Sequence, residues 1–455
     1  MTNLFRSCRF LTLIGFVLAI HLQMLNAQNP IIRDQFSADP SARVFNGRMY
    51  VFSSHDIKAP EGKGLRPEWF CMEDYYVYSS ENLVDWTNHG MILSQYDVPW
   101  VDSATYSMWA PDCIEKDGKY YFYFPANKIK EEGAKWGGFG IGVAVADSPE
   151  GPYVAQAEPI KGIHGIDPNV FIDKDGQAYI YYSLGQIFVA KLKDNMLELD
   201  SEPQAIANLP EKGMKEGPWL FEREGLYYLT LPHVENETER LEYAIADNPM
   251  GPFKMAGVIM DESPSGCWTN HHSIVEYQDQ WYLFYHHNDY SPNFDKNRSV
   301  RVDSLFFNSD GTIRKVSPTL RGVGISKAYN TIEIDRYSAI SDKGTEVAFI
   351  NSSDTFKGWK TLMSEKGAWL RYDRVDFSGQ KPGKIKLRVQ APSGAVIELR
   401  ENSLQGPILS KIKVPSGDTW QAVEAGVKNI KSEIIDLVFV LKKGSQLEID
   451  WVQFE

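Results

Sequence analysis

The feature that most constrains this fold is a hairpin pattern that occurs five times in the first two-thirds of the chain. Each occurrence has an apolar stretch, a turn built on Gly or an Asx-type residue, and then paired aromatic residues. The occurrences begin at Val44, Ile114, Phe171, Phe221 and Val275. Asn-Gly and Asp-Gly supply the positive φ of tight hairpins, and aromatic residues favour strands. A spacing of about 50–70 residues is typical of four-stranded propeller blades.

A second repeat supports this division. Residues 146–153 (ADSPEGPY) resemble residues 246–253 (ADNPMGPF). Helical periodicity is hardly visible in this part of the chain. We therefore predict an all-β protein with a five-bladed β-propeller over residues 28–325.

The rhythm changes after the propeller. From about Thr331 the chain has short alternating strands separated by Gly, Ser and Pro turns, which predict a β-sandwich of jelly-roll type over residues 330–455. The connection near residues 322–330 is too short to give long-range flexibility.

The first 27 residues have the pattern of a secretory signal peptide. Arg6 and Arg9 precede an apolar run from Phe10 to Ile20, and Ala27 offers a small residue for cleavage. We expect residues 1–27 to be removed and the protein to be secreted or periplasmic. No later run approaches ~18 apolar residues, so we expect no membrane span.

Composition excludes some functions. The chain has 60 Asp and Glu against 47 Lys and Arg, and a net charge of −13 repels nucleic acid. Beyond the leader, three cysteines remain, Cys71, Cys113 and Cys267, and no CxxC pair indicates zinc or redox chemistry. One disulfide among them stays possible, with its partners open. We expect a monomer.

Acidic residues and a histidine recur shortly before the hairpins. Asp39, Asp167, Glu216 and His271 take this place in four of the five units. If each first strand starts at the propeller axis, they converge on one funnel, where like charges raise one another's pKa. The alternative is that Asp-Pro and Glu-Gly-Pro merely end loops.

The blocks around these residues resemble glycoside hydrolase family 43. They are Ala38-Asp39-Pro40-Ser41, Trp109-Ala110-Pro111-Asp112, Gly165-Ile166-Asp167-Pro168, Lys215-Glu216-Gly217-Pro218 and His271-His272-Ser273-Ile274. The resemblance implies a five-bladed propeller that cleaves terminal or side-chain glycosides with inversion. It also implies that Asp39 is the general base, that Glu216 is the general acid, and that Asp167 orients the acid and raises its pKa.

The same resemblance suggests further site residues. His271 matches an axial histidine near a water-bound calcium, and Arg298 matches an arginine that touches substrate. Trp109 and Trp219 adjoin the acidic blocks, so they either stack on a sugar or pack between blades.

Two other segments leave alternatives open. Adjacent His286 and His287 point to opposite faces of a strand, so we expect one to line the pocket and the other to pack, without a transition metal. Residues 60–74 form a long insertion, which is either a specificity loop over the pocket or surface decoration.

The C-terminal part resembles a family 6 carbohydrate-binding module. The resemblance rests on residues 332–338, 367–372, 419–421 and 449–454. It implies that Trp420 stacks on sugars and that Glu333, Asp335 and Asp450 lie near a structural calcium. Glu448 replaces an Asn that often binds sugar hydroxyls, so the module either binds glycan or only buttresses the propeller.

Together these patterns predict an inverting, exo-acting glycoside hydrolase of arabinose- or xylose-containing plant glycans. We expect an α-L-arabinofuranosidase or β-xylosidase, with β-galactosidase as an alternative within the family. Endo-arabinanase fits less well, because the early insertion would close one end of a groove. A non-catalytic glycan-binding protein is the main alternative from another class, and a protein scaffold is weaker, since neither needs the set Asp39, Asp167 and Glu216.

Overall fold

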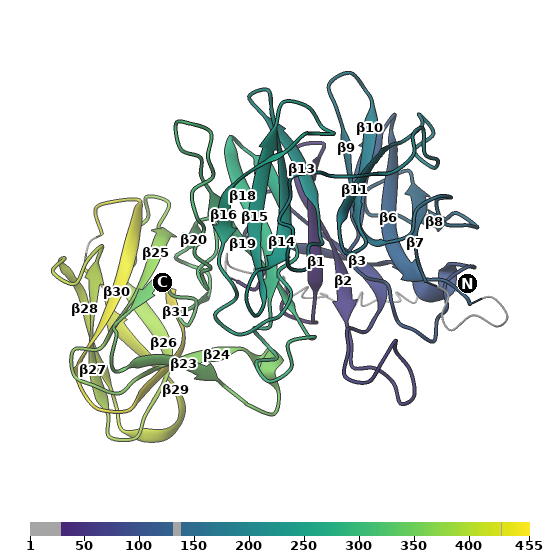
Figure 1. Ribbon diagram of the computed structural model, residues 1–455. Helices are drawn as coiled ribbons and strands as arrows, with labels where there is room; N and C mark the ends of the chain where they lie inside the picture. The colour runs from purple at the N-terminus through teal and green to yellow at the C-terminus, as the bar shows by residue number, and fades with distance from the viewer. Residues whose placement is uncertain (1–28, 131–137, 429) are drawn as a thin grey trace, which may run out of the picture.

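The computed structural model describes residues 29–130, 138–428 and 430–455, and its regular structure is almost entirely β (Figure 1). The only helical elements in these ranges are two 3₁₀ turns, η1 (Gln95–Asp97) and η2 (Thr355–Lys357). The expected signal peptide lies outside the described residues.

The first part of the chain forms five antiparallel sheets in chain order. The first two are β1 (Ala38–Phe45), β2 (Arg48–Asp56), β3 (Met72–Ser80) and β4 (Thr87–Ser94), then β5 (Asp112–Lys116), β6 (Lys119–Asn127), β7 (Phe139–Ala146) and β8 (Val154–Ala155). The next two are β9 (Ile166–Ile172), β10 (Ala178–Ser183), β11 (Ile187–Lys191) and β12 (Gln204–Ala205), then β13 (Trp219–Arg223), β14 (Leu226–Val234), β15 (Glu239–Ala246) and β16 (Lys254–Met260). The fifth is β17 (His272–Tyr277), β18 (Gln280–His287) and β19 (Ser299–Leu305).

These sheets are the five blades of a propeller, as predicted. The first strands β1, β5, β9, β13 and β17 pack against one another in a closed ring. Blade five has three strands, and the segment before β1 runs along its β19: the Ile31 amide donates to the Val300 carbonyl at 2.9 Å, and the Ser37 amide to the Arg298 carbonyl at 2.9 Å. The start of the propeller chain thus closes on its last blade.

Paired aromatic residues hold neighbouring blades together. Successive side chains on a strand point to opposite faces, so a pair serves both neighbours of its blade. On β6, Phe122 packs against Phe52 of blade one with ring centroids 5.8 Å apart. The next residue, Tyr123, donates its hydroxyl to the Met196 carbonyl of blade three at 2.7 Å. The aromatic pairs that repeat in the sequence therefore supply the packing between neighbouring blades.

The C-terminal part is a sandwich of two sheets with a shared apolar core. One sheet has the order β20 (Ser326–Lys327), β25 (Trp369–Asp376), β30 (Ile434–Lys443), β27 (Ala395–Glu401), β28 (Ile408–Val414), with β22 (Ala339–Ile340) beside β25. The other has the order β23 (Thr345–Phe349), β24 (Trp359–Met363), β31 (Leu447–Phe454), β26 (Lys384–Ala391), β29 (Gly417–Gly426), with β21 (Ile332–Glu333) beside β31.

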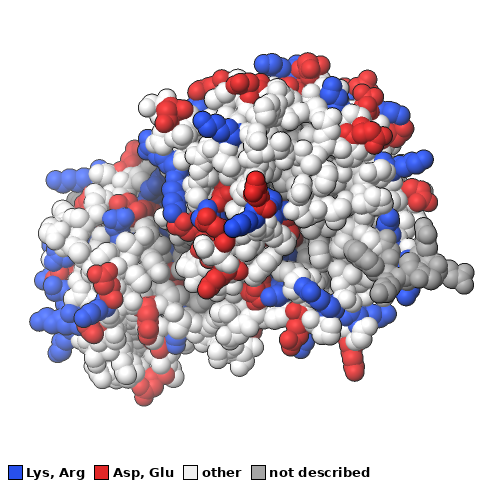
Figure 2. Space-filling view, in the orientation of Figure 1, with Lys and Arg blue, Asp and Glu red and all other residues white. Residues whose placement is uncertain are grey.

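On the face seen in Figure 2, basic side chains lie singly or in small groups among acidic ones. None of the described helices is long and apolar enough to cross a membrane. All three described cysteines are buried and unbridged.

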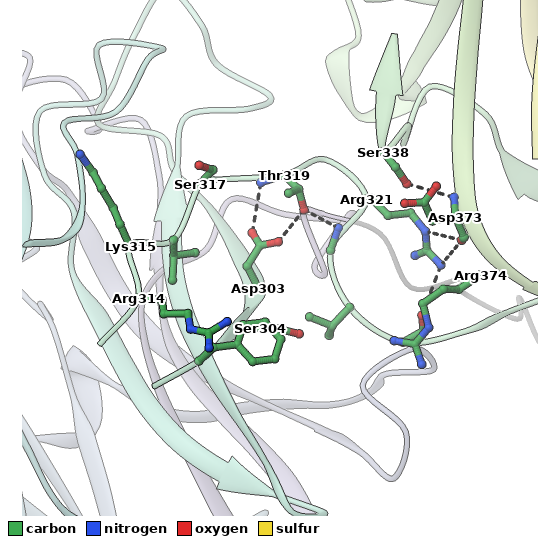
Figure 3. Close-up of a pocket in the computed structure, with 15 residues that line it drawn as sticks. Asp303, Ser304, Arg314, Lys315, Ser317, Thr319, Arg321, Ser338, Asp373 and Arg374 are labelled. Carbon is green, nitrogen blue, oxygen red and sulfur yellow. Dashed lines mark hydrogen bonds between the residues drawn. The ribbon is translucent and has the colours of Figure 1, made fainter. Parts of the chain in front are cut away.

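The two units meet across a polar joint. One side is a cavity of about 400 Å³ along the connecting segment, where Thr319 binds Asp303 of β19 and the Arg321 guanidinium donates to the Asp373 carbonyl of the sandwich (Figure 3). Such contacts fix the connection and leave it little freedom.

The other side of the joint is centred on Arg336, which is 1% exposed. Its guanidinium donates to the Asn29 carbonyl and, at 3.2 Å, to the Tyr290 hydroxyl, both in the propeller part, and lies 4.1 Å from the Trp359 ring centre. Its Nε lies 3.0 Å from a carboxylate oxygen of Asp335.

We predict that Arg336→Met destabilises the protein by about 3–5 kcal/mol, because it leaves the buried Asp335 without its cation. Urea denaturation followed by fluorescence measures this change. The matched control is Arg371→Met, whose exposed pair with Asp373 should contribute less than about 1 kcal/mol. Equal losses in the two variants would contradict the role of Arg336.

Candidate active site

The two predicted catalytic aspartates have the same unusual backbone conformation, one in blade one and the other in blade three. Asp39 in β1 and Asp167 in β9 both precede a proline and adopt left-handed backbone conformations, with φ of 53° and 56°. At each of them the register with the second strand shifts. Such conformations cost about 1–3 kcal/mol in non-glycine residues and concentrate at functional sites. Both carboxyl groups line one cavity.

Asp39 is surrounded by hydrogen-bond donors. The Arg298 guanidinium donates to its Oδ1 at 2.8 Å and its Oδ2 at 3.3 Å, and the Ser54 hydroxyl donates to Oδ2 at 2.6 Å. Arg298 also binds Asp56, at 2.8 and 2.9 Å, so one buried guanidinium serves two buried carboxylates. These donors hold the Asp39 carboxylate in one orientation on the cavity wall.

A buried histidine fixes the Asp39 backbone. The Asp39 amide donates to Nδ1 of His286 at 3.0 Å, and Nε2 of this ring lies 2.9 Å from the Thr269 hydroxyl. Burial lowers the pKa of His286 well below its ordinary value, so the ring is neutral with its hydrogen on Nε2. Burial also lowers the pKa of His287, to about 3. Neither ring lines the cavity, contrary to the expectation for one of them.

Asp167 is tied to the backbone beside Glu216. Its Oδ2 accepts from the Ser183 hydroxyl and from the Gly217 amide, each at 3.0 Å. Gly217 has a φ of 52°, and a Cβ there would lie 2.9 Å from Nδ1 of His271, so this position requires glycine. Burial, and then the charge of Glu216, raise the pKa of Asp167 to about 7. Asp167 is thus placed to orient the predicted acid.

Glu216 faces the cavity and lies within hydrogen-bonding reach of a second glutamate, Glu239, at the start of β15. Burial raises the pKa of Glu216 well above its ordinary value, and the charge of Glu239 adds to this. Glu239 was not predicted from the sequence. It lies in the run Glu237-Thr238-Glu239-Arg240-Leu241-Glu242, which has the pattern of an exposed charged strand and carries no repeated motif.

The site is a cavity of about 350 Å³. Its walls bring together Asp39, Asp167, Glu216, His271 and Arg298 with the aromatic residues Trp69, Phe70, Trp109 and Trp268. Four of these lining residues, Arg66, Trp69, Phe70 and Met72, come from the insertion at residues 60–74, which is therefore a loop over the pocket. Nε1 of Trp109 is buried without a hydrogen-bond partner among the described residues, so it can donate to a ligand hydroxyl.

Two tryptophans that were predicted to bind sugar, Trp219 and Trp420, lie outside this cavity. Trp219 is 4% exposed between blades, where its Nε1 donates to the Ile274 carbonyl at 2.8 Å and Arg43 lies 4.2 Å from its ring centre. It therefore packs between blades and does not line the cavity. Trp420 lies on β29 of the sandwich, with Arg388 4.7 Å from its ring centre.

The predicted calcium ligands do not form a metal site. Each of the three sandwich carboxylates is engaged by an arginine, in the pairs Glu333–Arg33, Asp335–Arg336 and Asp450–Arg388. Both carboxylate oxygens of Asp335 nevertheless lie buried without a hydrogen-bond partner among the described residues. Within residues 29–130, 138–428 and 430–455, no three His, Cys, Asp or Glu side chains are placed to hold one ion. A calcium held through water beside His271 requires no such group.

A five-bladed propeller with a donor-bound carboxylate and a carboxyl of raised pKa facing one cavity is typical of a glycosidase of the propeller type. The chain belongs to glycoside hydrolase family 43, because the family described as "Glycosyl hydrolases family 43" matches residues 27–313. The "Carbohydrate binding module (family 6)" matches residues 339–455.

Known relatives agree with this assignment. The chain is 38% identical over 337 residues to "Xylosidase/arabinosidase 43A" of Humicola insolens, which covers 64% of this chain and 99% of that protein. It is 35% identical over 325 residues to "Xylosidase/arabinosidase" of Bacteroides ovatus, covering 62% and 95%.

Two solved structures extend the comparison. A β-xylosidase/α-arabinofuranosidase from a compost microbial metagenome, solved with xylotriose in a calcium-free form, is 36% identical, with a TM-score of 0.58 over 65% of this chain and 98% of that one. An arabinoxylan arabinofuranohydrolase from Bacillus subtilis shares the fold across both units, with 24% identity and a TM-score of 0.53 over 94% of this chain and 99% of that one.

The different positions of Trp109, in the cavity wall, and Trp219, between blades, can be tested by substitution. We predict that Trp109→Phe raises KM for an aryl glycoside roughly 5–10-fold, since one hydrogen bond to substrate contributes about 1–1.5 kcal/mol. Trp219→Phe should leave kcat/KM within about twofold while lowering the melting temperature, because it removes a bond between blades. Steady-state kinetics and calorimetry measure both, and a KM effect confined to Trp219→Phe would contradict the placement.

Proposed function

We propose that the protein is an inverting, exo-acting glycosidase that removes terminal α-L-arabinofuranosyl or β-D-xylosyl groups from plant-type glycans. The observation that carries the proposal is the contrast between two acidic groups in one cavity. Asp39 is bound by a guanidinium and a hydroxyl, whereas Glu216 is half-buried beside another carboxyl group. The names of the relatives support the choice of sugars.

In the proposed reaction the two groups act on opposite sides of the scissile bond. Glu216 gives its proton to the glycosidic oxygen as the bond from that oxygen to the anomeric carbon breaks. Asp39 takes a proton from a water whose oxygen attacks the same carbon from the other face, so the configuration inverts. Asp167 holds the backbone next to the acid and keeps Glu216 aimed at the leaving oxygen.

The cavities around Glu216 indicate how the substrate lies. Glu216 lines a second cavity, of about 420 Å³, which Asp39 does not reach. Trp109, Phe139 and Met214 also line it. Because the leaving group departs on the side away from the base, we assign this second cavity to the leaving group and the 350 Å³ cavity to the terminal sugar.

The sandwich, in this proposal, buttresses the propeller. Arg388 lies over the Trp420 ring, and Lys360 donates to Glu448 at 2.8 Å, so Trp420 and Glu448 already have partners within the chain.

The apolar run before Ala27 supports the further proposal that the protein is secreted or periplasmic, which N-terminal sequencing of the mature protein would test.

The test is hydrolysis of aryl α-L-arabinofuranoside, β-D-xyloside and β-D-galactoside, together with arabinoxylan, by the wild type, Asp39→Asn and Glu216→Ala. We expect Asp39→Asn to lose about 10²–10⁴-fold on every substrate. Glu216→Ala should lose as much on arabinoxylan but far less on activated aryl glycosides, whose leaving groups need little protonation. NMR of the first-formed anomer checks inversion.

Other outcomes would favour a different function or a different assignment of the catalytic residues. A wild type that cuts only the galactoside would favour β-galactosidase, and one that binds but cuts no glycan would favour a glycan-binding protein. Full activity in both variants would refute the assignment of the acid and the base.

A further inference from the structure

Glu239 is a completely buried acidic residue that the reaction described above does not use. It begins β15 in blade four and is 0% exposed. Its Oε2 accepts from the Asn270 amide at 2.9 Å, and its own amide donates to the Trp268 carbonyl at 3.0 Å. Both bonds fix Glu239 to the segment that carries His271 to the cavity wall, although Glu239 itself does not line the cavity.

The second carboxylate oxygen of Glu239 lacks an ordinary donor. Oε1 is buried and has no hydrogen-bond partner among the described residues. The Glu216 carboxyl lies within hydrogen-bonding reach of Glu239, and a bond between two carboxyl groups forms only when one of them carries a proton. Because a buried acceptor without a donor is destabilising, a proton on Glu216 would satisfy Oε1.

We propose that Glu239 is the positioning residue of the general acid: its buried carboxylate accepts the hydrogen bond of the Glu216 carboxyl, and so holds both the proton and the rotamer of the acid until substrate arrives. This inference rests on the proposed function, because it gives Glu239 a role through Glu216. On substrate binding, the Glu216 proton turns from Glu239 to the glycosidic oxygen, and the Asn270 amide keeps Glu239 in place.

The surrounding groups favour a charged Glu239 and a protonated Glu216. The other charged or titratable groups facing the pair are Asp39, Asp167 and Arg298, with His271 beside Asp167. Burial raises the pKa of both glutamates. The Asn270 amide donates to Glu239, which favours the charged form of Glu239, so we place the shared proton on Glu216. Among neighbouring charges, that of Glu239 contributes most to the shift at Glu216.

The experiment compares pH profiles of kcat for the wild type and Glu239→Gln. The alkaline limb reports loss of the proton from Glu216. Removing the negative neighbour lowers the pKa of Glu216, so the limb should move to lower pH by about one unit or more. The variant should also lose about 10-fold or more on xylobiose or arabinoxylan, but under threefold on a 2,4-dinitrophenyl glycoside, which needs no acid.

The matched control is Glu242→Gln, a buried glutamate on the same strand that pairs with Arg240 and His233. It should leave the alkaline limb in place, whatever it does to stability. An unchanged limb in a folded Glu239→Gln, or equal losses on both substrate types, would overturn the role of Glu239. A wild type with no activity on any glycoside would instead refute the proposed function.

A second measurement does not depend on a variant at position 239. In wild-type protein labelled with ¹³C at the glutamate side-chain carboxyls, the Glu216 signal, assigned by its absence in Glu216→Gln, should titrate in two coupled steps. The lower step would coincide with ionisation of a second glutamate. A single-step titration of Glu216 would overturn the proposal even if Glu239→Gln does not fold.

Discussion

The arrangement of the site depends on one buried guanidinium. Arg298, at the start of β19 in blade five, binds both Asp39 and Asp56 of blade one, and its backbone carbonyl accepts from the Ser37 amide. Two carboxylates could not be buried together here without this cation. The contact that closes the ring of blades is therefore also the contact that places the base. Since its donors are shared between two carboxylates, Arg298 acts on substrate mainly through the shape and charge of the cavity wall.

The acid and the base are distinguished by their surroundings more than by their residue types. Asp39 accepts hydrogen bonds from a guanidinium and a hydroxyl, whereas burial, and then the charge of Glu239, raise the pKa of Glu216 well above its ordinary value. Contrasting surroundings of two acidic groups are a general mark of acid–base catalysis. The guanidinium comes from blade five, so the ring must close before Asp39 has this partner.

The sequence predicted the propeller and the meeting of Asp39, Asp167, Glu216 and His271, because both follow from repetition: each blade starts at the axis, and residues before its first hairpin share a place in the ring. Features that lie outside the repeated pattern were not predicted. Glu239 lies at the start of a third strand within a charged run, and only tertiary packing buries it. Trp219 adjoins the acid in sequence, yet the alternation of a strand directs it into the neighbouring blade.

The sandwich carboxylates that were expected near calcium each lie beside an arginine, and two of these pairs explain the joint between the units. The relative from Humicola insolens matches over 99% of its own length while covering 64% of this chain, so a propeller of this kind needs no sandwich. An added unit must bring its own interface. Here Glu333 binds Arg33 of the propeller segment, and Asp335 holds Arg336, which reaches Asn29 and Tyr290. These pairs of carboxylates and arginines therefore join one unit to the other.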